Sequence, residues 1–298
     1  MEIIKTIAEM QEKSRSLIKN GKSIAFVPTM GYFHDGHTSL INLASDYADV
    51  VVTSLFVNPT QFAPNEDFAK YPRDFNRDCT IAKNAGSDIL FNPDVGEMYP
   101  SNYFTSVVVA EISEKFEGKF RPTHFTGVAT VVTKLLNIVN PDFAIFGQKD
   151  YQQLLIVKKL VRDLNINTKI ITAPTKRQSD GLAMSSRNVY LSQGERNNAS
   201  ILYLAMENAI KIIENGENRR KIINATMHNT LRSVPDIKID YASAAEADTL
   251  AEPEFFLPGT RLVLLLAVYL GKTRLIDNSI VSLPEQKFEK PEWVKEVL

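Results

Sequence analysis

The residues best suited to chemistry in this chain are two histidines in the segment PTMGYFHDGH, residues 28–37. His34 and His37 follow a short apolar stretch, and the residues after them have the apolar spacing of a helix. Imidazole N–H groups at a helix N-terminus can donate to a phosphate, where the helix dipole adds partial positive charge. Gly31 and Gly36 would let a nucleotide approach the backbone closely. The segment therefore indicates a phosphate-binding loop.

Other interpretations of this pair remain open from the residues alone. An H-x-x-H pair also fits metal ligands or a surface turn. A metal site is less favoured, because no cysteine, third histidine or carboxylate cluster nearby completes a ligand set. His124 and His228 have no comparable setting and are expected to be structural. Cys79 is the only cysteine, which excludes an intrachain disulfide, and we expect a half-buried thiol there.

Polar groups in three further segments could serve the same ligand. Lys149 and Asp150 follow the apolar run FAIF, where a Lys can neutralise a phosphate and an Asp can hold a ribose hydroxyl or a metal-bound water. The segment 181–188, GLAMSSRN, offers two hydroxyls and an arginine that suit a triphosphate. Gln61 and Gln153 are neutral donor-acceptor groups suited to a small hydroxylated substrate. Taken singly, each segment is equally typical of a solvated surface or a helix cap.

Alternating strands and helices would position these loops. Strands are expected at residues 23–27, 49–57, 88–91, 143–146 and 168–173, with helices between them. This alternation predicts an α/β fold with a parallel sheet, and ligands of such sheets bind beyond the carboxyl ends of the strands. The pattern breaks near Pro174, so we place a domain boundary near residue 175, followed by a smaller α+β domain.

Composition narrows the classes of partner. The chain has 298 residues, 44% of them hydrophobic, and its 34 basic and 35 acidic side chains give a net charge of -1. Such a balance argues against nucleic acid or a membrane surface as the partner. The longest apolar run, residues 262–270, is too short to span a bilayer, and no export signal is recognised, so a cytoplasmic location is expected. Residues 284–298 read as a loosely attached charged tail.

Several motifs in chain order carry a resemblance to a known family. PTMG, HDGH, NPTQF, YPRD, FRPTHFTGVATVV, FGQKDYQQ and GLAMSSRN lie between residues 23 and 191, with a weaker echo in LGKTRLIDN. Together they resemble the pantothenate synthetase (pantoate–β-alanine ligase) family of the H-x-G-H nucleotidyltransferase superfamily. The resemblance implies a Rossmann-like sheet with helices on both faces over residues 1–175, a smaller α+β lid domain over residues 176–298, and a homodimer.

The resemblance also implies a reaction. It is the condensation of pantoate with β-alanine to pantothenate, using ATP and Mg²⁺, through a pantoyl adenylate, with release of AMP and pyrophosphate. His37 and His34 would be the catalytic pair, with His37 donating to the phosphates and His34 helping to hold the nucleotide. One alternative is another H-x-G-H enzyme that acts on a phosphorylated acceptor, which would need Lys or Arg where this chain has glutamines. A second alternative is a non-catalytic nucleotide-binding protein.

The resemblance assigns binding roles residue by residue, with the metal ligands left open. ATP contacts are expected at Met30, Gly31, Tyr32, Phe33, His34, Asp35, Gly36, His37, Gly147, Gln148, Lys149, Asp150, Lys176, Met184, Ser185, Ser186 and Arg187. At Lys176 the contact would come from the backbone. Pantoate and β-alanine are expected at Gln61, Gln153 and Asn58.

Overall fold

The computed structural model describes residues 1–64 and 66–285, so most of the expected charged tail lies outside the described residues. The chain divides into two compact units, Met1–Asn197 and Asn198–Leu298. We expected the domain boundary between residues 175 and 176, whereas the two compact units divide between Asn197 and Asn198. The segment between the two positions belongs to the first unit and contributes residues to its site, as described below.

The first unit is built on a six-stranded sheet in the order β1-β4-β3-β2-β5-β6, and every strand pair is parallel. The strands are β1 (Glu2–Ile4), β2 (Ile24–Thr29), β3 (Val50–Leu55), β4 (Ile89–Phe91), β5 (Phe143–Gly147) and β6 (Lys169–Ala173). Their buried, β-branched sequences suit strands covered on both faces. The expected parallel sheet is confirmed.

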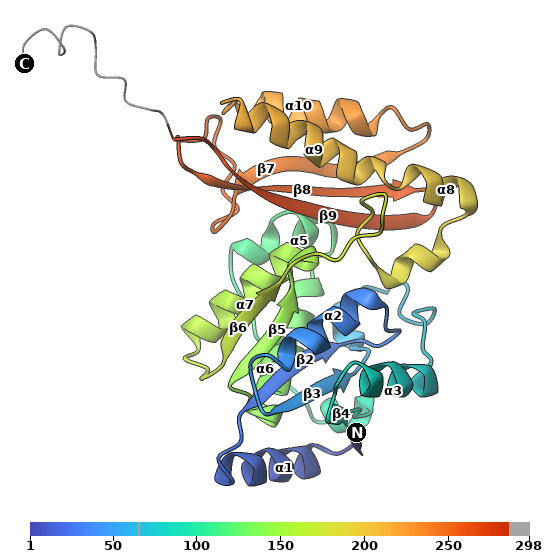
Figure 1. Ribbon diagram of the computed structural model, residues 1–298, viewed down its shortest axis with the longest axis vertical. Coiled ribbons are helices and arrows are strands. Elements are labelled where there is room, and N and C mark those ends of the chain that lie inside the picture. Colours follow the sequence, from blue (N-terminus) through green and yellow to red (C-terminus); the bar gives the residue numbers. More distant parts are fainter. Residues whose placement is uncertain (65, 286–298) are drawn as a thin grey trace, which may run out of the picture. The chain divides into compact units, whose positions relative to one another are not determined.

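Helices cover both faces of this sheet (Figure 1). They are α1 (Ile7–Lys19), α2 (Asp35–Ala44), α3 (Phe75–Asn84), α4 (Val95–Met98), α5 (Glu117–Phe120), α6 (His124–Val139) and α7 (Tyr151–Asp163), with short 3₁₀ turns η1 (Pro59–Gln61), η2 (Ile112–Glu114), η3 (Gln148–Asp150) and η4 (Ser186–Tyr190). Helices α2 and α3 pack together on one face, and α1 and α7 flank α6 on the other.

The strand order reverses direction at β2. From β2 the chain adds β3 and then β4 on one side, and it returns to place β5 and β6 on the other. The chain connections that leave the carboxyl ends of β2 and β5 therefore run in opposite directions, and in open α/β sheets this is the position at which ligands bind. The loop after β2 carries His34 and His37, and the loop after β5 carries Lys149 and Asp150.

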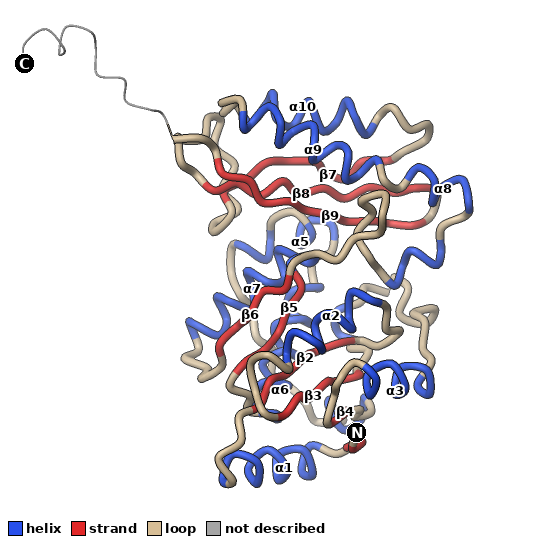
Figure 2. Tube along the Cα trace, viewed as in Figure 1, coloured by secondary structure: helices blue, strands red, loops and turns tan. Residues whose placement is uncertain are grey.

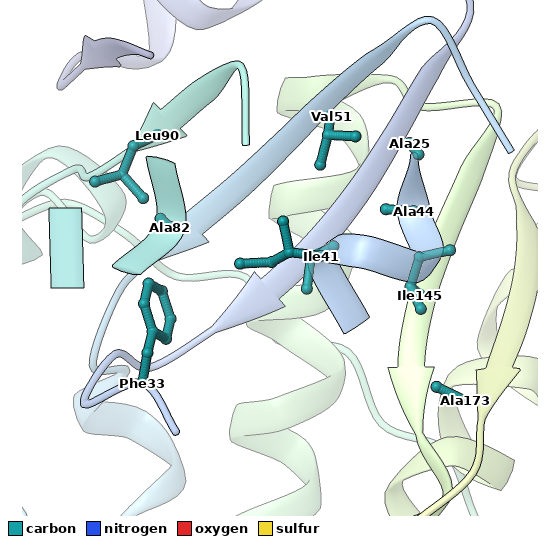
Figure 3. Packing of buried hydrophobic residues seen from close by; sticks show 10 residues of the cluster. Ala25, Phe33, Ile41, Ala44, Val51, Ala82, Leu90, Ile145 and Ala173 are labelled. Atoms are coloured by element: carbon teal, nitrogen blue, oxygen red, sulfur yellow. The ribbon is translucent and has the colours of Figure 1, made fainter. Parts of the chain in front are cut away.

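The hydrophobic core between the sheet and α2 includes a residue of the loop after β2 and so holds this loop in place. It contains Ala25, Val27, Phe33, Ile41, Ala44, Val51, Ala82, Leu90, Ile145 and Ala173, all buried (Figure 3). Phe33 belongs to the phosphate-binding loop, yet its ring is fully buried in this cluster beside Ile41. Burying such a side chain contributes roughly 2–3 kcal/mol, so the loop has a fixed anchor next to its histidines.

The second unit is a three-stranded antiparallel sheet with helices on one face (Figure 2). Its elements are α9 (Ile201–Glu214), α10 (Arg220–Leu231), β7 (Lys238–Glu246), β8 (Arg261–Leu270) and β9 (Thr273–Ser282), and α8 (Gln193–Asn198) precedes them at the division between the units. This confirms the expected α+β class for the C-terminal part. None of the helices in the described parts of the chain has the length and apolarity needed to cross a membrane.

Some expected elements were wrong in detail. Residues 2–4 form a strand paired with β4, whereas no strand was expected before residue 23. Strand β9 was not predicted, because its alternating polar residues lack a long apolar run. Pro28 lies inside β2, in register with Ser54, and does not end the strand. Helix α2 begins at Asp35, so His37 lies within its first turn.

Candidate active site

The loop after β2 has an unusual backbone that a neighbouring helix holds in place. Gly31 and Tyr32 both have positive φ angles, 85° and 51°. The backbone N–H groups of Tyr32 and Phe33 donate to the two carboxylate oxygens of Asp78 on α3, at 2.6 and 2.8 Å. Arg77, the preceding residue, donates to the carbonyl of Phe33 at 2.8 Å. Neither Arg77 nor Asp78 was singled out from the sequence, because nothing local marks a surface-helix carboxylate as a loop anchor.

His34 and His37 form a reciprocal cap at the start of α2. His34 Nδ1 accepts the backbone N–H of Gly36 at 3.1 Å, and His37 Nδ1 accepts the backbone N–H of His34 at 3.4 Å. The ring centroids are 4.0 Å apart. Because both Nδ1 atoms are acceptors, a neutral ring carries its proton on Nε2. Each imidazole therefore presents an Nε2–H donor away from the helix.

The surroundings keep both imidazoles neutral. Burial and the charge of Lys149 lower the pKa of His34 to about 4. Burial, the neighbouring His34 and Lys149 lower the pKa of His37 well below its usual value. In the ligand-free protein at pH 7, the pair therefore donates hydrogen bonds without adding positive charge, and the full charge at the site comes from lysine and arginine.

Gly36 is required by close packing between two loops. A Cβ at this position would lie 2.8 Å from two atoms of the His34 ring and 3.6 Å from the Cβ of Met184. The first contact is shorter than real Cβ atoms allow, so any side chain here displaces the imidazole. The second contact shows that the segment around Met184 lies against the start of α2. Loops separated by almost 150 positions in the sequence thus meet, in agreement with the expected convergence.

The segment after Met184 presents hydroxyls and a fixed guanidinium. Ser185 caps η4 by accepting the N–H of Arg187 at 3.3 Å, and Ser186 hydrogen bonds to Tyr71, whose pKa is raised by burial. Arg187 donates from Nε and Nη2 to the two oxygens of Asp67, at 3.1 and 3.0 Å. This bidentate pair holds the guanidinium plane and does not use the N–H groups of Nη1.

The loop after β5 supplies the charged groups of the site. Lys149 Nζ lies 3.6 Å from a carboxylate oxygen of Asp150. The charges of both residues act on the pKa of His34, and the Asp150 charge also acts on Arg187. Next to them, Gly147 ends β5 with an ordinary extended backbone, and a Cβ built there would meet nothing within 4 Å. Open space therefore borders the end of this strand.

A cluster of neutral polar side chains lies beside the loop after β2. Gln61 is 8% exposed, and its Nε2 faces Met30 Sδ at 3.2 Å while its Oε1 accepts from Asn58 Nδ2 at 3.0 Å. Asn58 is fully engaged: Nδ2 also donates to the Gly127 carbonyl, and Oδ1 accepts from Thr60 and Tyr99. Asn58 therefore orients Gln61, and Gln61 faces the phosphate-binding loop.

The imidazole of His124 hydrogen bonds to the backbone carbonyl of the same glutamine, Gln61. Its Nδ1 lies 2.9 Å from the Gln61 carbonyl, and Arg121 donates to its Nε2 at 3.2 Å. Because Nε2 accepts, Nδ1 carries the proton and donates to Gln61. Arg121 is itself held by a bidentate pair with Glu66. Burial lowers the pKa of His124 to about 4. The expected structural role of His124 is thus consistent with its contacts, and it acts at the edge of the site.

The remaining residues that we predicted for the site are more exposed or make fewer side-chain contacts. Gln153 is half-buried in the first turn of α7, and its side-chain amide makes no hydrogen bond to the described residues. The side chain of Lys176 is exposed, and its carbonyl accepts the N–H of Met184. Asp35 is exposed at the first position of α2, and Gln148 is half-buried in η3. His228 belongs to the second unit.

No protein cage for a metal forms in the described part of the chain, where no three His, Cys, Asp or Glu side chains gather in a ligand set. Cys79 is half-buried, as expected, and burial raises the pKa of its thiol. The arrangement as a whole combines donors for a polyanion, one lysine and a cluster of neutral polar side chains. It suits a chemistry in which charge moves along a phosphate chain next to a small polar substrate.

Comparison with known proteins agrees with this geometry. A family model described as pantoate-beta-alanine ligase matches residues 2–280. The chain is 50% identical to the pantothenate synthetase of Caldicellulosiruptor bescii over 281 residues, covering 94% of this chain and 99% of that protein. It is 49% identical to the pantothenate synthetase of Moorella thermoacetica over 283 residues, covering 95% and 99%.

Solved structures give the same picture. The crystal structure of pantothenate synthetase from Thermus thermophilus superimposes with a TM-score of 0.87 at 41% identity, covering 94% of this chain and 99% of that chain. The pantoate-beta-alanine ligase of Francisella tularensis, described as complexed with beta-gamma ATP and beta-alanine, has a TM-score of 0.76 at 38% identity and covers 94% and 97%.

Proposed function

Because the chain belongs to the pantoate-beta-alanine ligase family and is an enzyme that joins pantoate and β-alanine in an ATP-dependent reaction, we propose that it forms a pantoyl adenylate at the loops after β2, β5 and β6. The single observation that carries this mechanism is the meeting of His34, His37, Lys149 and Met184 at one end of the sheet. The complex described for the Francisella tularensis relative supports ATP and β-alanine as ligands of one protein of this family.

In the first half-reaction, the pantoate carboxylate attacks the α-phosphorus of ATP and pyrophosphate leaves. A carboxylate is ionised at neutral pH, so this step needs no general base. The protein contributes donors to the growing charge on the phosphates: Nε2–H of His37 and His34, the ammonium of Lys149, and Nη1 of Arg187. Ser185 and Ser186 add hydroxyls without adding charge. One such donor is typically worth about 3 kcal/mol in an enclosed site.

Mg²⁺ fits this set of residues as an ion held mainly by the phosphates. Magnesium usually binds through substrate phosphates, waters and one or two carboxylates, and a complete protein cage is not required. Asp150, with its half-exposed carboxylate, would be the ligand from this chain. When bound, the ion would neutralise charge on the phosphates.

In the second half-reaction, the β-alanine amine attacks the acyl carbon and AMP leaves. Gln61 and Gln153 would hold pantoate, with Gln61 also contacting β-alanine and Asn58 fixing its orientation. Neutral amides can orient a hydroxylated substrate without a charge that would retain the product. The mixed anhydride hydrolyses in water, so the segment 177–188 would close over it to exclude solvent.

We further propose a homodimer located in the cytoplasm. The single cysteine means that no intrachain disulfide contributes to stability, which suits a reducing compartment. Phe104 is 93% exposed and Val108 is 66% exposed in an extended segment of the first unit. A second copy of the chain is the proposed partner, and these two side chains are the proposed contact surface.

The assay that tests the proposed mechanism follows AMP, pyrophosphate and pantothenate during incubation with ATP, Mg²⁺, pantoate and β-alanine. We expect equal amounts of the three products. Without β-alanine, about one equivalent of pyrophosphate per active site is expected, with pantoyl adenylate recovered from the protein. Formation of ADP and phosphate in place of AMP and pyrophosphate would overturn the adenylate mechanism.

A further inference from the structure

A buried carboxylate on another helix binds the backbone of the loop after β2. Asp78 is 1% exposed and lies in the first turn of α3. Both of its oxygens accept backbone N–H groups of the loop, from Tyr32 at 2.6 Å and Phe33 at 2.8 Å. Hydrogen bonds to an ionised acceptor are shorter and stronger than neutral ones.

The loop needs such an acceptor because of its backbone. Tyr32 has a φ of 51°, a region that costs a non-glycine residue roughly 1 kcal/mol or more. Gly31, with a φ of 85°, approaches so closely that a Cβ there would lie 2.9 Å from Asp78 Oδ2. Two successive left-handed residues turn the N–H groups of Tyr32 and Phe33 toward α3. Without a buried acceptor, both donors would be left unsatisfied.

Arg77, which precedes Asp78 in the same helical turn, also holds the loop after β2. Its guanidinium donates to the Phe33 carbonyl at 2.8 Å, lies 4.9 Å from the centre of the Tyr32 ring, and has Nη1 3.6 Å from Asp78 Oδ1. Phe33 is therefore fixed through its N–H, its carbonyl and its buried ring (Figure 3). The next residue is His34, whose backbone and ring set the position of His37.

We propose that Asp78 is a positioning residue for adenylate formation: its carboxylate sets the backbone of residues 31–33 and, through it, the direction of the two Nε2–H donors of His34 and His37. This inference rests on the proposed roles of the two histidines. A displacement of about 1 Å in such donors is enough to reduce a rate on the order of a hundredfold. Asp78 would contact neither ATP nor pantoate.

The experiment uses Asp78→Asn, which keeps the volume but turns an NH₂ group toward a backbone N–H. The matched control is Asp277→Asn in the second unit, where a carboxylate that is 3% exposed accepts the backbone N–H of Asn278. Three quantities are measured well below each protein's melting temperature: the single-turnover rate of pyrophosphate release, the KM values for pantoate and β-alanine, and the imidazole ¹⁵N chemical shifts of His34 and His37.

We expect Asp78→Asn to slow pyrophosphate release by roughly tenfold to a hundredfold, to leave both KM values within about twofold, and to shift the imidazole signals. Asp277→Asn should lose stability but keep rate and signals. If folded Asp78→Asn releases pyrophosphate at the wild-type rate with unchanged imidazole signals, Asp78 is structural only. If the wild-type protein itself forms no adenylate, the proposed mechanism fails instead, so the two failures are distinguishable.

Discussion

At the scale of single residues, the proposed chemistry requires that the neutral rings of His34 and His37 carry their protons on Nε2. The Nδ1 atoms of His34 and His37 both accept backbone N–H groups, so the outward nitrogen of each neutral ring is a donor. Burial and Lys149 keep the pKa values low, and the pair therefore stays neutral before ATP arrives. A neutral donor stabilises charge that develops on a phosphate without holding pyrophosphate as strongly as a second lysine would.

Replacing His37 tests this assignment. His37→Ala removes the Nε2–H donor, and we expect adenylate formation to fall on the order of a hundredfold or more while the protein still folds. His37→Gln places an amide N–H near the former Nε2 position and should recover part of the loss. Single-turnover pyrophosphate release measures both variants. Full activity in His37→Ala would show that this imidazole has no role in the chemistry.

His124 allows a residue-scale prediction about stability. Its pKa is about 4 in the folded protein and about 6.5 when unfolded, so between these values the unfolded chain binds more protons. The stabilisation from neutral His124 is complete above pH 6.5 and is lost as the pH falls toward 4, by about 3 kcal/mol in all.

Urea unfolding at several pH values measures how the free energy of unfolding changes with pH. Wild type should lose stability between pH 6.5 and 4 faster than His124→Gln, which has no proton to gain. Parallel curves for the two proteins would mean that the pKa of His124 is the same in the folded and unfolded states. The comparison within one series removes the contribution of all other titrating groups.

At the scale of elements, a glycine at the start of α2 is closely packed, whereas a glycine at the end of β5 has open space around it. Gly36 touches the His34 ring, whereas Gly147 borders open space with a backbone that any residue adopts. The first glycine therefore fixes the position of the His34 ring, and the second borders the space in which the proposed nucleotide would bind.

Substitution at each position should separate these roles. Gly147→Val is expected to keep the melting temperature within a few degrees but to raise the KM for ATP by about tenfold, because its side chain projects into the nucleotide space. Gly36→Ala should reduce kcat, because its Cβ displaces the His34 ring. Steady-state kinetics with ATP varied decides between them. An unchanged KM in Gly147→Val would place the nucleotide elsewhere.

Much of this element-scale picture is predictable from the sequence. Apolar runs such as FAIF mark the strands, and polar loops after them mark the site, because ligands of a parallel sheet bind at its carboxyl edge. The contributions of Asp78 and Arg121 are not predictable in this way, since Asp78 accepts from backbone groups distant in the sequence and Arg121 pairs with Glu66, which is also distant in the sequence. Strand β1 was missed because three residues carry no periodic pattern, and its pairing with β4 is purely tertiary.

At the scale of the whole molecule, the proposed dimer makes the exposed segment around Phe104 a buried one. Phe104 is 93% exposed, and in the proposed dimer the second copy of the chain would cover its ring. The backbone around it forms no strand within the chain, although Val107 N–H donates to Thr130.

Sedimentation analysis tests the dimer directly. Wild type is expected to sediment as a dimer and Phe104→Asp as a monomer, because a buried carboxylate without a partner is unfavourable. The control is Leu257→Asp, at a side chain that is 75% exposed in the second unit, and it should remain dimeric. A monomeric wild type, or dissociation by the control alone, would exclude this surface.

The central claim is that residues from loops distant in the sequence surround one triphosphate. A crystal structure with a non-hydrolysable ATP analogue and pantoate measures this most directly. We predict the triphosphate at the carboxyl ends of β2 and β5, with Nε2 of His37 and Nζ of Lys149 within hydrogen-bonding distance of its oxygens. A nucleotide bound at another edge of the sheet, or with His37 Nε2 directed away from the phosphates, would contradict the account.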